Sequence, residues 1–189
     1  CRHRTLATRD AALRRRRQDP TPTYRAAIED LNRAIAVNAR DGEAHYGRGM
    51  VLNNLAFFLA DVGEDAAPAW ADSIEAYGRA LEVNPKDAAA LRGRGMARTN
   101  RGAFFRARNT SWRDDFAKGI EDYSSAIGIN PGDAECWLYR GQARAELARD
   151  EGDSRKREAL RRDGAADLRK AAELNPALRP EVERLLQSD

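Results

Sequence analysis

The chain contains little of the material from which sheet proteins, disulfide-rich domains and membrane proteins are built. Its 189 residues include only two cysteines, Cys1 and Cys136, too few and too far apart for a disulfide framework or a zinc site. Valine, isoleucine and threonine together number seventeen, so the β-branched residues typical of strands are scarce. No apolar run approaches the roughly 20 residues of a membrane-spanning helix. We therefore expect neither a sheet-based fold nor a membrane partner.

An excess of charge of one sign is also missing. There are 33 basic and 30 acidic residues, which gives a formal net charge of +3, and aromatic residues make up 7% of the chain. A surface of mixed sign does not mark a dedicated binder of polyanions. Alanine is abundant, with 35 residues, and so is arginine, with 29 against four lysines. Because both residues favour helices, the composition predicts an all-α fold.

The strongest pattern in the sequence is an internal repeat. An Arg-Gly pair recurs in steps of 46 residues, at Arg48-Gly49, Arg94-Gly95 and Arg140-Gly141. An Asn-Pro pair recurs at Asn84-Pro85, Asn130-Pro131 and Asn175-Pro176. Before each Asn-Pro pair, small and apolar residues occur at i, i+1, i+4 and i+7, which is one face of a helix. Each repeat is thus predicted to be a helical hairpin that begins after a capping aspartate and ends at Asn-Pro.

These motifs resemble those of the tetratricopeptide repeat family over about residues 24 to 176. The matching positions are the first-helix glycine (Gly49, Gly95, Gly141), the second-helix aromatic (Tyr77, Tyr123) and alanine (Ala34, Ala80, Ala126, Ala171), and the final proline (Pro85, Pro131, Pro176). The resemblance implies an α-solenoid of stacked antiparallel hairpins. The period of 46 residues exceeds the 34 of the family, so each helix is expected to be about six residues longer.

We expect a single repeat domain over residues 1–189. It divides into a partial first hairpin (1–40), three repeats (41–86, 87–132 and 133–177) and a C-terminal capping helix (178–189). Arg2 to Arg17 should form the first helix of the partial hairpin, with Thr23 to Asn38 as its partner. Turns inside the hairpins are expected at Gly63, at Asn109 followed by a Ser111 cap, and at Gly152 to Ser154. The start at Cys1, within an apparent helix, indicates a segment of a longer chain.

In the resembled family, the first helices line a concave groove that binds extended peptides or a partner's helix. Mapping their exposed stripe predicts a groove formed by Tyr46, Met50, Asn53, Asn54, Arg92, Met96, Thr99, Asn100, Leu138 and Gln142. Asparagine amides bind peptide backbones and methionine adapts its shape, so this stripe favours a modestly apolar peptide. Alternatively, the methionines are contacts between repeats and the asparagines are solvated. The family's clamp for a C-terminal carboxylate is not reproduced.

Arginines form a second pattern along the solenoid. Arg48, Arg94 and Arg140 should stack one repeat apart, joined by Arg98 and Arg144 one turn further on. They could bind an acidic partner, but internal pairing with Glu29, Glu75 and Glu121, which recur at the same spacing, is the preferred interpretation. Two basic clusters, at 14–17 and 155–162, could contact phosphates. Neither contains interleaved aromatics, so both are better explained as solvated helix faces.

Groups suited to catalysis are few. His3 and His45 have no serine or cysteine beside them at helical spacing, and Cys136 adjoins Trp137 on an expected buried face. With no phosphate-binding glycine loop and no metal-ligand spacing, we expect no enzyme activity, cofactor or metal. The resemblance implies an interaction or scaffold segment of a larger bacterial protein, which binds a protein or peptide in its groove. We separately expect a cytoplasmic localisation. Binding of nucleic acid or an acidic polymer through the arginines, and structural self-association, remain alternatives.

Overall fold

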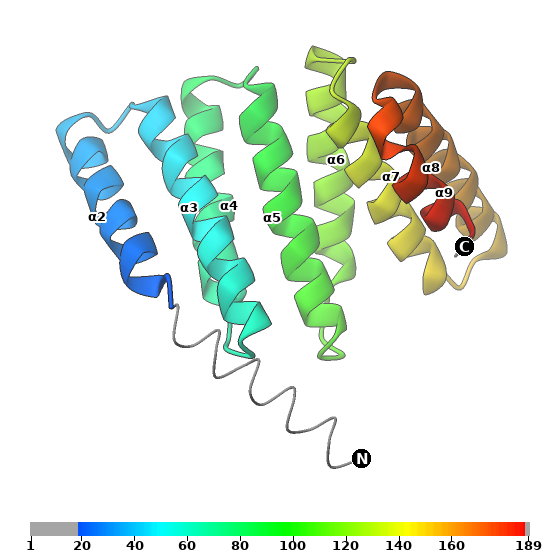
Figure 1. Cartoon of the computed structure of the whole chain (residues 1–189), viewed down its shortest axis with the longest axis horizontal. Coiled ribbons are helices and arrows are strands. Elements are labelled where there is room, and N and C mark those ends of the chain that lie inside the picture. Colours follow the sequence, from blue (N-terminus) through cyan, green and yellow to red (C-terminus); the bar gives the residue numbers. More distant parts are fainter. Residues whose placement is uncertain (1–18, 188–189) are drawn as a thin grey trace, which may run out of the picture.

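The computed structural model describes residues 19–187, which form helices and no strands (Figure 1). The helices are α2 (Thr21–Val37), α3 (Gly42–Asp61), α4 (Ala67–Val83), α5 (Ala88–Arg106), α6 (Arg113–Ile129), α7 (Ala134–Arg149), α8 (Ser154–Leu174) and α9 (Arg179–Gln187), with a 3-10 turn at Pro176–Leu178. The predicted all-α fold is confirmed. The helix expected over Arg2 to Arg17 lies outside the described residues. None of the described helices is long and apolar enough to cross a membrane.

Consecutive helices pair as hairpins that stack along the molecule. α3 packs on α4, α5 on α6 and α7 on α8, and the second helix of each hairpin also contacts the first helix of the next. The first helices α3, α5 and α7 also contact one another in sequence. In Figure 1 these helices and α9 lie toward the viewer, with α4, α6 and α8 behind them. The hairpins therefore form a helical solenoid with a first-helix face and a second-helix face.

The ends of the helices lie where the repeated motifs predict them. The carboxylates of Asp41, Asp87 and Asp133 each accept a hydrogen bond from a backbone N–H in the first turn of α3, α5 or α7. Asparagine follows the last residue of each second helix, in an extended or near-extended conformation, at Asn38, Asn84, Asn130 and Asn175. These are local signals, because a carboxylate cap and a helix stop act on their own turn.

The turns inside the hairpins also follow the prediction, except for one cap. Gly63 (φ 83°) and Asn109 (φ 54°) adopt the left-handed conformation that glycine and asparagine tolerate best. Asp153 caps α8 by accepting from the N–H of Arg155 and Lys156. The prediction that Ser111 caps α6 is wrong. α6 begins one residue later, after Trp112, whose ring packs on Phe116 with centroids 5.4 Å apart, and it has no side-chain cap.

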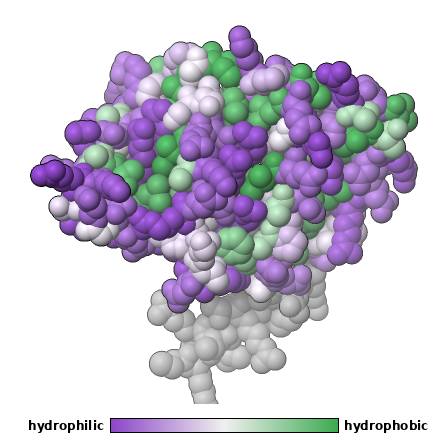
Figure 2. Space-filling view, turned by 180° about the vertical axis from the view of Figure 1, so that it is seen from behind, coloured by the Kyte–Doolittle hydropathy of each residue, from purple (hydrophilic) through white to green (hydrophobic). Residues whose placement is uncertain are grey.

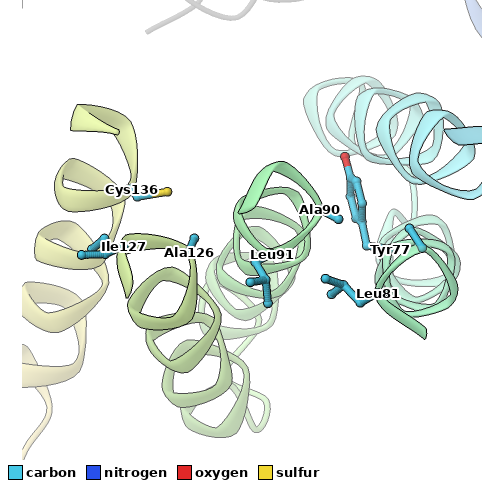
Figure 3. Packing of buried hydrophobic residues seen from close by; sticks show 8 residues of the cluster. Tyr77, Leu81, Ala90, Leu91, Ala126, Ile127 and Cys136 are labelled. Carbon is cyan, nitrogen blue, oxygen red and sulfur yellow. The ribbon is translucent and has the colours of Figure 1, made fainter. Parts of the chain in front are cut away.

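Glycine allows the two helices of a hairpin to approach closely. A Cβ added to Gly49 would lie 2.9 Å from the ring of Tyr77, and one added to Gly95 would lie 2.8 Å from the ring of Tyr123. The core between hairpins is a thin layer, in which Figure 3 shows Tyr77, Leu81, Ala90, Leu91, Ala126, Ile127 and Cys136. The glycine of the repeat is thus required by the aromatic or large apolar side chain that packs over it.

The added length of the helices contains its own core. Leu55, Trp70 and Phe104 are buried together, and the Trp70 and Phe104 ring centroids lie 5.3 Å apart. Phe57, next to this core, is 45% exposed, with its ring centroid 6.0 Å from that of Trp70. The long hairpins are therefore packed along their length, and Phe57 extends from this core to the surface.

Candidate interaction groove

A groove with a volume of about 450 Å³ opens between the first helices. Its walls come from α3, α5, α7 and α9, and include Phe57, Met96, Thr99, Asn100, Ala103, Tyr139, Gln142, Ala145, Glu146, Arg149 and Leu185. Phe116 and Tyr123 of α6 and Leu168 of α8 are buried residues that close its floor. The groove is mainly apolar at its base and carries its polar groups on the walls.

Four of the predicted groove residues line this groove, namely Met96, Thr99, Asn100 and Gln142. Met50, which is 46% exposed, and Asn54 lie exposed on α3 but not among the lining residues. The remaining half-buried members make contacts of their own. The Tyr46 ring lies edge-on to that of Tyr77, with centroids 5.6 Å apart. Arg92 forms ion pairs with Asp133 and Glu135, so it joins adjacent repeats.

The prediction that Asn53 and Leu138 line the groove is wrong, because both side chains are buried. Asn53 is 6% exposed. Its equivalent one repeat later, Thr99, lies 3.2 Å from the Tyr123 hydroxyl, so this position faces the second helix of its own hairpin. Leu138 is 4% exposed and packs with Val182, since the capping helix α9 covers this end of the stripe.

The prediction from sequence also omitted several residues that line the groove. Phe57, Ala103 and Arg149 occupy equivalent positions 46 residues apart, one turn beyond the end of the mapped stripe. The sequence did indicate these positions, because helices that are about six residues longer extend the exposed stripe by one more turn. Tyr139 was also missed. It follows the buried Leu138 on α7, and its ring centroid lies 6.0 Å from that of Tyr123.

Most polar groups of the groove are already engaged within the protein. Gln142 donates to Glu181 of α9 over 3.3 Å. Glu146 accepts from Arg106 and, at 2.8 Å, from Arg149, while Arg106 also pairs with Asp150 at 2.9 Å. The side-chain amide of Asn100, by contrast, forms no hydrogen bond with any described residue. The groove thus has balanced charges and one free amide.

The repeated arginines are paired inside the protein, but with acids other than those predicted. Asp122 and Asp167 are each 3% exposed. Asp122 binds Arg94 (2.6 Å) and Arg98 (2.7 Å), and Asp167 binds Arg140 (2.7 Å) and Arg144 (2.6 Å). Pairing with Glu121 is wrong, because one residue turns the side chain by about 100° and places Glu121 on the exposed face of α6. Pairing with Glu75 and Glu29 is wrong as well, since they lie beside Arg79 and Arg33.

Arg48 lacks such a partner. The position equivalent to Asp122 is Ala76, and Leu52 replaces the second arginine. The Nε of Arg48 is buried without a hydrogen-bond partner among the described residues. The arginine positions also lie away from the groove. Arg94 and Met96 are separated by about 200° around α5, so the paired arginines face the second helices and Met96 faces the groove.

Of the two basic clusters, residues 14–17 lie outside the described part of the chain. In the other, Arg162 pairs with Asp163 at 2.9 Å, and Arg157 donates to the backbone carbonyl of Glu151 at 3.1 Å. The remaining members Arg155, Lys156 and Arg161 are exposed on α8. Figure 2, which views the molecule from behind, shows hydrophilic residues over most of this face. Two members of the cluster, Arg157 and Arg162, are thus bonded within the protein, and the other three are exposed to solvent.

Of the residues considered for catalysis, Cys136 and His45 are part of the core, and His3 lies outside the described residues. Cys136 is fully buried, and burial raises the pKa of its thiol to about 12. His45 is buried as well, with its Nε2 3.0 Å from the backbone oxygen of Ala39. Within residues 19–187 no three acidic, histidine or cysteine side chains gather as a metal site would require. Neither Cys136 nor His45 lines the groove.

No protein-family model and no curated protein matches this chain. Solved structures do resemble it. The crystal structure of the MamA protein matches with a TM-score of 0.54 and 21% identity, over 83% of this chain and 67% of that one. The Arabidopsis OM64 TPR domain matches with a TM-score of 0.50 and 19% identity, over 76% of this chain and 98% of that one. At such identities the likeness concerns the fold.

Proposed function

We propose that this chain, which has the fold of a tetratricopeptide-repeat solenoid, binds a segment of a protein partner in the groove between α3, α5 and α7. The observation that carries the proposal is the groove itself, an open and mainly apolar cavity of about 450 Å³. Phe57 on its wall and Met50 on the same helix are about half exposed. Exposed large apolar side chains beside a cavity are typical of a binding surface.

The polar groups available at the groove suit a peptide backbone. The side-chain amide of Asn100 lines the groove, and Asn54, at the equivalent position on α3, is exposed outside it; neither side chain forms a hydrogen bond with the described residues. An amide both donates and accepts, so it can bind a backbone whatever the partner's side chains are. Met96, one turn before Asn100 on α5, adapts to apolar side chains of different shape. These features favour recognition of an uncharged, apolar segment.

Two observations make the alternatives less favourable. The side chains of the arginines at 94, 98, 140 and 144 are bound to buried aspartates and are only 12–23% exposed, so they present little surface to an acidic polymer. The buried positions of Cys136 and His45 support a binding role over a catalytic one. Self-association is distinguished by light scattering, in which a mass that rises with concentration would favour it over capture of a separate partner.

The proposal is tested with a random peptide library displayed on phage. The variant Met96→Glu with Asn100→Ala places a charge on the groove wall and removes its free amide. We expect it to bind the peptides selected by the original protein at least about tenfold more weakly, because a buried charge there has no partner. Binding by the original protein should change little with salt, since the groove charges are paired.

The matched control is Ala117→Glu with Ser125→Ala, which changes exposed residues of α6 on the opposite face. It should bind the selected peptides as the original protein does. Helical circular dichroism should be the same for all three proteins. Equal binding by the groove variant and the control would contradict the proposal.

A further inference from the structure

We infer that Ala103 and Ala145 form a pocket within the groove for one bulky, uncharged side chain of the partner, that is, an aromatic residue, leucine or methionine. The inference depends on the proposed function, because it specifies what the partner presents to the groove. It goes beyond that function by predicting which residue of the partner contributes most of the affinity.

The pocket exists because two repeat positions carry small side chains on adjacent helices. Ala103 on α5 is the equivalent of Phe57 on α3, and Ala145 on α7 is the equivalent of Thr99 on α5. Both alanines line the groove between α5 and α7. At the position where α3 carries the phenyl ring of Phe57, α5 carries only the methyl group of Ala103, which leaves space in the groove. A ring from a partner can occupy the space that the protein fills for itself one repeat earlier.

The surroundings of the two alanines match a pocket for an apolar anchor. Phe116, Tyr123 and Leu168 form a buried floor, and Phe57 and Met96 stand on the walls. The Tyr123 hydroxyl is already paired with Thr99, and burial raises its pKa far above the usual range, so it stays neutral. Pockets of roughly 300–1,000 Å³ with apolar walls and few polar groups are typical binding sites, and bulky anchors dominate such interfaces.

The charge balance of the pocket excludes a charged anchor. Glu146 is held by both Arg106 and Arg149, and Arg106 is also paired with Asp150. A charged side chain entering the pocket would lose its hydration without meeting an unpaired countercharge. The amide of Asn100 remains available to bind the backbone next to the anchor. The pocket thus selects for size and neutrality.

The test uses peptides selected from a random phage library against the original protein. We expect them to share one bulky uncharged residue, whose replacement by alanine lowers affinity at least about tenfold. Ala103→Phe, which introduces the ring of the equivalent position 57, should lower affinity by a similar factor. Ala145→Leu adds a smaller side chain to the pocket from α7, so it should lower affinity by a smaller factor. Ala117→Phe, on exposed α6 surface, is the matched control and should bind normally. Thermal unfolding checks that each variant is folded.

Two failures are distinguishable. If the selected peptides share no bulky residue, or if folded Ala103→Phe binds them as the original protein does, the pocket inference is overturned. The groove proposal then stands only if Met96→Glu with Asn100→Ala still weakens binding. If that double variant also binds normally, or if no peptide is enriched, the proposed function fails and the pocket inference fails with it.

Discussion

Replacing Ala76 with aspartate should stabilise the protein. In the later hairpins, Asp122 and Asp167 occupy this position and each binds two arginines. In the α3–α4 hairpin, Arg48 is retained but the carboxylate is missing, and its Nε is buried with no hydrogen-bond partner in residues 19–187. Ala76→Asp would supply the acceptor at the position where the repeat geometry already places one.

The expected gain is modest because two effects oppose each other. An unsatisfied buried donor costs about 1–3 kcal/mol, and a hydrogen bond to a charged group contributes roughly 1.5–3 kcal/mol. The new carboxylate loses hydration at a fully buried position, and Leu52 denies it a second arginine. We expect a net gain of about 1 kcal/mol in the free energy of unfolding, or a rise of about 2–4 °C in melting temperature for a chain of this size.

The assay is urea unfolding followed by far-ultraviolet circular dichroism. Ala76→Asn is the matched control, since it has a similar shape without the charge and should gain less. Asp122→Ala should lose about 3–5 kcal/mol, because it leaves two arginines without their carboxylate. The reasoning is refuted if Ala76→Asp lowers the free energy of unfolding and Asp122→Ala leaves it nearly unchanged. The buried ion pairs would then contribute nothing to stability.

Two further predictions concern the core. Gly95→Ala would place a Cβ 2.8 Å from the Tyr123 ring, so it should lower the free energy of unfolding by about 1–3 kcal/mol in the same urea assay, whereas Gly128→Ala, with no atom within 4 Å, should not. Burial raises the pKa of the Cys136 thiol from 9.0 to about 12, so its contribution to stability is complete below pH 9 and is lost as the pH rises toward 12. In a Cys1→Ser background, Cys136→Ala should therefore lose less stability between pH 9 and 11, and Cys136 should react with thiol reagents only after unfolding.

The helices could be predicted from the sequence because their signals are local. An aspartate caps the turn that follows it, and an Asn-Pro pair ends the helix before it, whatever the rest of the chain does. Their recurrence every 45 or 46 residues then indicated the stacking of hairpins as well. Met96, Asn100 and Gln142 were placed in the groove for the same reason, since helical spacing relates them to the first-helix glycine.

The errors concern positions whose environment depends on another element. Leu138 has the spacing of a groove residue, but α9 covers it, and no feature of its own repeat indicates that. The pairing of Arg94 with Asp122, and not with Glu121, depends on a rotation of one residue on the opposing helix. The short side chains of Ala103 and Ala145 create space only because α5 and α7 lie side by side. Spacing along one helix does not contain this information.

The two sides of each first helix tolerate substitutions differently. On one side of α5, Arg94 and Arg98 bind a buried aspartate, where loss of a partner leaves uncompensated charge. On the other side, Met96 and Ala103 contact the groove, where a substitution leaves the ion pairs and the glycine contact intact. Under the proposed function, substitutions at Met96, Asn100 and Ala103 should therefore alter partner choice with little cost in stability, whereas substitutions at Arg94 or Gly95 should lower stability first. A repeat built in this way can change its groove residues while the hairpin beneath them stays the same.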